Sequence, residues 1–77
     1  MGKKEELVAR LFSAAAASWR EYNEARQGGN IGEMRSAFDN IVKCLRVVYK
    51  AGYPKEVEQF LRKNEMPVRA ILKKIRE

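Results

Sequence analysis

The chain has 77 residues, of which 45% are hydrophobic and 34% charged, and it carries a formal net charge of +6. This length predicts one domain over residues 1–77 that buries roughly 60% of its surface, so the monomer should be modestly stable and self-association is an open option. Because there is no His and a single Cys, the composition excludes an intrachain disulfide and the common zinc and haem ligand sets, and it favours a reducing, cytoplasmic setting.

The first predicted helix covers about residues 4–27. At 100° per residue its apolar side chains fall on one arc, which predicts a helix with one dry face. Residues 14–17, all alanine, form a smooth stretch where a neighbour can approach closely, and Gly28-Gly29 is expected to end the helix. The residues on the apolar arc are Leu7, Val8, Leu11, Phe12, Ala15, Trp19 and Tyr22.

A second helix is expected to begin after Asn30, which can cap it, with Glu33 in a box-like arrangement three residues later. The sequence Gly52-Tyr53-Pro54 predicts its end, with Gly52 in the left-handed conformation of a Schellman motif and Pro54 preventing continuation. On a helical wheel, nine apolar or weakly polar residues fill an arc of about 160°. So wide an arc predicts contacts with two neighbours and places this helix at the centre of the fold.

A third helical segment is expected to start at Pro54, and its apolar phase continues beyond Pro67. Pro67 removes a helical hydrogen bond and disfavours the α conformation at Met66. We therefore predict a kink or one-turn break at residues 64–67 that leaves two collinear or bent pieces. The expected fold is all-α, an antiparallel three-helix bundle with the third helix kinked or broken near residues 64–67, giving three or four helices.

No constellation suited to catalysis is visible. Without His, Cys44 has no base, and its place at the edge of an apolar arc predicts a buried small side chain. Acidic residues pair with Lys or Arg at helical spacing, as Glu6 does with Arg10, and form no metal-binding cluster. No apolar run reaches the length of about 18 residues that a membrane span needs. The sequence thus predicts no enzyme, no cofactor or metal, no small-molecule substrate and no membrane partner.

Basic residues form two stripes along the predicted second and third helices. All of the net charge lies in residues 35–77, which hold eleven basic and five acidic residues. If the stripes merge into one face, they form a candidate polyanion-binding site; otherwise they solubilise the outer faces of a thermostable bundle. The candidate residues are Arg35, Lys43, Arg46 and Lys50 on one stripe, and Lys55, Arg62, Arg69 and Arg76 with Lys73 beside them on the other.

Two resemblances bear on these predictions. Residues 55–76 resemble a helix-turn-helix unit with residues 64–66 as its turn, which implies that Arg69, Lys73 and Arg76 face a nucleic-acid groove. As a whole, the chain resembles the short helical-bundle proteins of hyperthermophilic archaea in its size, composition and helix breakers. The second resemblance implies no activity.

Two functions remain open from the sequence. The first is a non-enzymatic protein-association module that binds itself or a partner helix, because the apolar arcs are wide for so short a chain. Val47 also stands isolated on the polar side of the second helix. The alternative is a nucleic-acid-binding module that uses the basic stripes. On either hypothesis Trp19, Tyr22 and Tyr49 are expected to pack in the core.

Overall fold

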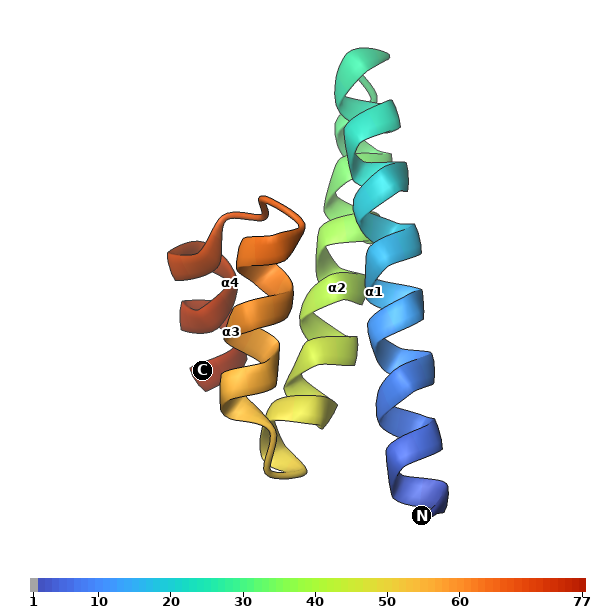
Figure 1. The fold of residues 1–77 in the computed structure, drawn as a ribbon. Helices are drawn as coiled ribbons and strands as arrows, with labels where there is room; N and C mark the ends of the chain where they lie inside the picture. The colour runs from blue at the N-terminus through green and yellow to red at the C-terminus, as the bar shows by residue number, and fades with distance from the viewer. Residues whose placement is uncertain (1) are drawn as a thin grey trace.

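A computed structural model describes residues 2–77, which form four α-helices and no strand (Figure 1). The long helices α1 and α2 run antiparallel as a hairpin, and the short helices α3 and α4 form a second pair beside α2. The predicted all-α bundle is thereby confirmed, with four helices. Their bounds are Lys3–Gln27 for α1, Ile31–Lys50 for α2, Pro54–Lys63 for α3 and Val68–Arg76 for α4.

The first three helices end in the same way. The residue after each C-cap is left-handed, with φ of 73° at Gly29, 105° at Gly52 and 56° at Glu65. In each case the next N–H donates back to a carbonyl five residues earlier, which is the long bond of a Schellman motif. The predicted stops at the two glycines are confirmed, whereas the third uses a residue with a Cβ. The bonds run from Asn30 to Ala25, from Tyr53 to Val48 and from Met66 to Leu61, at 2.8, 3.3 and 2.9 Å.

Asn30 caps α2 as predicted. Its Oδ1 accepts a hydrogen bond from the N–H of Glu33 at 3.1 Å. Because Asn30 also closes the Schellman motif of α1, it ends one helix and begins the next. The connection is therefore short, and α1 and α2 must lie side by side.

The break at residues 64–67 is confirmed, but it turns the chain back instead of leaving collinear or bent pieces. Asn64 ends α3, since its Nδ2 donates to the carbonyl of Phe60 at 2.8 Å. Glu65 then takes the left-handed conformation and Pro67 an extended one, with ψ of 94°. As a result α4 folds back along α3 (Figure 1).

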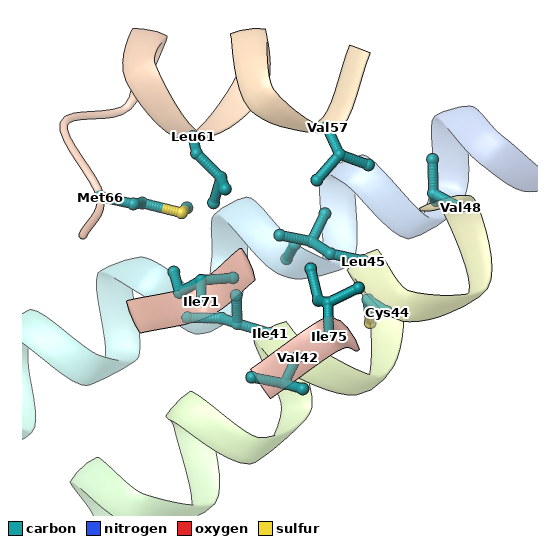
Figure 2. Close-up of a cluster of buried hydrophobic side chains, with 11 residues drawn as sticks. Ile41, Val42, Cys44, Leu45, Val48, Val57, Leu61, Met66, Ile71 and Ile75 are labelled. Atoms are coloured by element: carbon teal, nitrogen blue, oxygen red, sulfur yellow. The ribbon is translucent and has the colours of Figure 1, made fainter. Parts of the chain in front are cut away.

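The core lies where α3 and α4 cover the C-terminal half of α2 (Figure 2). Helix α2 contacts each of the other three helices, which confirms its predicted central position. Helix α1 reaches α3 through Phe12, whose ring centroid lies 4.8 Å from that of Phe60. The largest fully buried side chains are Ile41, Leu45 and Val48 of α2, Val57 and Leu61 of α3, and Ile71 of α4.

Small residues let α1 and α2 approach closely. Ala15, Ala25 and Ala37 are buried, and so is Ser18. The buried hydroxyl is satisfied, because the Nδ2 of Asn40 donates to the Oγ of Ser18 at 2.5 Å. Ala15, in the alanine stretch of α1, is fully buried in the core cluster, so neighbouring elements do approach this stretch closely.

Candidate functional site

The α1–α2 hairpin extends beyond the α3–α4 pair. Helices α1 and α2 contain 25 and 20 residues, whereas α3 and α4 contain 10 and 9. At 1.5 Å per residue, α2 is about 30 Å long and α3 about 15 Å. The turn between α3 and α4 accordingly stops short of the connection between α1 and α2 (Figure 1). We call residues 19–39, which include this uncovered end, the hairpin tip.

One side of the hairpin tip is aromatic and apolar. The ring of Trp19 stacks on Tyr22, with centroids 5.2 Å apart and planes at 11°. Tyr22 in turn meets Phe38 at 6.3 Å and 50°. Ile31 and Met34 line a shallow hollow together with Tyr22 and Phe38. We call these five residues the aromatic patch.

The aromatic patch is open to solvent. Ile31 is 67% exposed, and Trp19, Tyr22, Met34 and Phe38 are half-buried. The sequence pattern assigned Trp19 and Tyr22 to the core, and they do lie on the arc of α1 that faces its neighbours. Trp19 packs against the edge of the hydrophobic core and Tyr22 stacks on Trp19, so both rings are only partly buried.

Two opposite charges border the aromatic patch. Arg35 and Asp39 line the same hollow as Tyr22 and Phe38. They are four residues apart on α2, yet among the described residues neither belongs to an ion pair. The patch therefore has one unpaired base and one unpaired acid at its edge.

The hairpin tip as a whole is close to neutral. Residues 19–39 contain three basic and four acidic residues, for a net charge of −1. The rest of the chain contains thirteen basic and six acidic residues, for a net charge of +7. The excess positive charge consequently lies away from the aromatic patch.

A second hollow on the hairpin tip has a different character. It lies between α1 and α2 and is lined by small and polar residues, among them Glu21, Glu24, Glu33 and Asn40. The tip thus has one apolar hollow and one polar hollow. Protein interfaces are enriched in aromatic residues and Met and depleted in Glu. By this measure the aromatic patch resembles a protein interface, whereas the polar hollow with its three Glu side chains does not.

Part of the predicted basic set connects α2 with α4. The Nη2 of Arg46 donates to the backbone carbonyl of Lys74 at 2.8 Å. The Nε of Arg76 donates to the Oη of Tyr49 at 3.5 Å. These contacts bring α2 and the C-terminal part of α4 together, and they engage two of the nine candidate residues.

The other seven candidate residues lie on three helices. Arg69 and Lys73 line a shallow hollow on α4 with Arg76. Arg62 pairs with Glu58 at 3.1 Å, and Arg35 lies at the aromatic patch. The remaining three, all exposed, are Lys43 and Lys50 on α2 and Lys55 on α3.

Cys44 is buried, as predicted, and burial raises the pKa of its thiol. Among residues 2–77, no three His, Cys, Asp or Glu side chains are placed to hold a metal ion. None of the described helices is both long enough and apolar enough to span a bilayer.

No protein-family description, no curated protein sequence and no solved structure matches this chain. The candidate site is therefore interpreted from its own geometry and chemistry.

Proposed function

We propose that this protein is a non-enzymatic protein-association module that acts through the aromatic patch. The observation that carries the proposal is the continuous series of ring contacts from Trp19 through Tyr22 to Phe38, all three partly exposed on the α1–α2 hairpin. Aromatic residues and Met are enriched in protein interfaces, Trp and Tyr are frequent among the few residues that dominate the binding energy, and large contiguous apolar patches mark such surfaces. Ile31, with 67% of its surface exposed, continues this apolar surface on α2.

Site-specific photo-cross-linking in the cells that make the protein tests this proposal. A photoreactive phenylalanine analogue replaces Ile31 in one version and Val47 in a matched version, since both are large exposed aliphatic residues of α2. We expect a discrete protein adduct, identified by mass spectrometry, from position 31 and not from position 47. No adduct at position 31, or equal adducts at both positions, contradicts the proposal.

A second candidate function is nucleic-acid binding, which is favoured by the hollow where Arg69, Lys73 and Arg76 lie together on α4. The helix-turn-helix resemblance assigns the same three residues to a groove. Titration of duplex DNA and RNA at about 50 and 200 mM salt tests this candidate, because phosphate contacts make binding fall steeply with salt. Arg69→Gln should lower the salt slope by about one, whereas Arg10→Gln on α1 should not. No binding at about 50 mM salt removes this candidate.

A further inference from the structure

We propose that the aromatic patch is covered by the same patch of a second copy of this chain, related to the first by a two-fold axis. This inference rests on the proposed function, because it identifies the partner of the surface on which that function depends. It is carried by the exposed area of the chain, the charge of the hairpin tip, the charges at the edge of the patch and the shape of the molecule.

The exposed surface is larger than a compact monomer of this size needs. The chain exposes 5582 Å², whereas a compact monomer of 8.9 kDa exposes about 4,800 Å². The excess of about 800 Å² equals the share that each partner contributes to an interface of standard size. The radius of gyration agrees, at 12.3 Å against about 11.5 Å for a compact chain of this length.

Charge allows two copies to meet at their hairpin tips in spite of the net charge of +6. Each tip carries only −1, and the remaining +7 lies on the rest of the chain. The molecule is 41 Å long, so contact through the tips keeps much of the basic surface of one copy far from that of the other. Salt weakens the remaining repulsion, because exposed charges more than about 10 Å apart are largely screened at 0.1 M salt.

The edge of the patch is self-complementary. In a two-fold interface, a residue i that contacts j of the partner implies that j also contacts i. Arg35 and Asp39 are close together and unpaired within one copy. When α2 of the second copy runs antiparallel across the patch, each Arg35 faces the Asp39 of the other copy. Since each copy contributes one Arg35 and one Asp39, two ion pairs form between the copies.

The outline of the molecule fits this arrangement. The α3–α4 turn stops short of the α1–α2 connection, so each copy has a step beside its hairpin tip (Figure 1). Two copies that run in opposite directions fill each other's step. Residues 28–30 of one copy then approach residues 64–67 of the other, and both aromatic patches become covered.

Sedimentation equilibrium between about 5 and 500 µM measures the association, since interfaces of this size reach dissociation constants of micromolar or tighter. The emission of Trp19, the only Trp of the chain, reports whether the patch is covered. We expect a mass of twice 8.9 kDa at high concentration and a blue shift of Trp19 emission over the same range.

Ile31→Glu is the main test variant. Ile31 is the first residue of α2, where an acidic side chain is favourable for the helix, so the variant should fold. A Glu buried within the dimer interface should weaken dimerisation at least about 30-fold. Val47→Glu, on the other side of α2, is the matched control and should dimerise like the native chain.

Charge reversal tests the two-fold arrangement independently of folding. Arg35→Asp and Asp39→Arg should each weaken their own homodimer roughly tenfold, because each places two like charges opposite one another. An equimolar mixture of the two variants should associate at least as tightly as the native chain, since both pairs are again of opposite sign.

Each remaining outcome overturns this inference. In the first such outcome the native chain stays monomeric up to about 500 µM, and in the second Ile31→Glu dimerises as tightly as the native chain. In the third, the mixture of Arg35→Asp and Asp39→Arg associates no more tightly than either variant alone. A monomer that still gives an adduct with another protein at position 31, and none at position 47, overturns only self-association. A monomer without an adduct at position 31 overturns the proposed function as well.

Discussion

At the scale of single residues, the turn between α3 and α4 depends on an unusual conformation at Glu65. Its φ of 56° lies in the left-handed region. In the other two Schellman motifs the left-handed residue is a glycine, Gly29 or Gly52. A residue with a Cβ costs roughly 1 kcal/mol there, because the Cβ approaches the following carbonyl oxygen. The chain thus carries a small local strain at the turn that reverses its direction.

Glu65→Gly should therefore stabilise the protein by about 0.5–1 kcal/mol, since the relief of strain exceeds the entropy that glycine adds to the unfolded chain. In a domain of this size, that change raises Tm by roughly 2–8 °C. Thermal unfolding followed by circular dichroism measures it. The opposite exchange, Gly52→Ala at φ 105°, serves as the control and should lower Tm. An unchanged or lower Tm for Glu65→Gly contradicts this account of the turn.

The buried Cys44 gives a dependence of stability on pH. Burial raises the pKa of its thiol above the ordinary value of 9.0, so above pH 9 the unfolded chain loses this proton before the folded chain does. The contribution to stability is fully present below pH 9.0 and is lost as pH rises through the folded-state value. Above pH 9.0 the free energy of unfolding should fall more steeply in the native chain than in Cys44→Ala. The free energies are measured by denaturant titration at each pH. If they fall equally with pH in the native chain and in Cys44→Ala, the thiol has no such role.

At the scale of helices, α4 is attached to the bundle by its apolar face and by two polar contacts near its C-terminal end, of which the one made by Arg46 is the shorter. Ile71 and Ile75 are buried, and Arg46 of α2 binds the carbonyl of Lys74 at 2.8 Å. A guanidinium at a helix C-terminus also interacts favourably with the helix dipole. Arg46 is thus a structural residue as well as a member of the predicted basic stripe.

Arg46→Met keeps the apolar stem of the side chain and removes the hydrogen bond. We expect a loss of about 1 kcal/mol in stability, because a hydrogen bond from a charged donor to a partly exposed carbonyl is worth about that much. Hydrogen exchange should quicken in residues 72–76 more than in α1. The exposed Lys43, one turn earlier on α2, provides the control Lys43→Met, which should leave both quantities nearly unchanged.

The ends of the helices could be predicted from the sequence, whereas the path of the chain between α3 and α4 could not. Gly29, Gly52 and Pro54 act through their own backbone preferences, so they mark the ends of α1 and α2 and the start of α3 without reference to the rest of the fold. At residues 64–67 the apolar phase continues through Pro67. Periodicity records which face of a helix is apolar but not the direction of its axis, and Glu65 is not a residue type that signals a left-handed turn.

At the scale of the whole molecule, the aromatic patch follows from the unequal lengths of the two helical pairs. Trp19 and Tyr22 were predicted to be core residues because they lie on the arc that faces other helices. The apolar periodicity of a helix does not show how much of its length a neighbouring helix covers. Once α4 folds back, the cover beside α2 is only about ten residues long, and the hairpin tip stays open.

The difference in length between the two helical pairs also predicts that local stability varies along the hairpin. Ile41, Leu45 and Val48 belong to a core cluster that draws on all four helices, whereas Ala25 and Ala37 at the hairpin tip are buried outside that cluster. In dilute solution, amide hydrogens of the tip should exchange faster than those of residues 41–48, since local opening there exposes less buried apolar surface. Hydrogen exchange with mass spectrometry measures this. Uniform protection along the whole of α2 would contradict it.

The three Schellman motifs also bear on how the chain acquires its fold. Each connection is closed by backbone bonds that span only six residues, so neighbouring helices meet without a long search. Most contacts between helices join helices that are consecutive along the chain, and a smaller share, such as Phe12 with Phe60, join helices that are further apart in sequence. Chains rich in local contacts fold in microseconds to milliseconds. The aromatic patch is therefore presented by a chain that has already folded, and association should proceed as the docking of preformed surfaces, with little change in helix content.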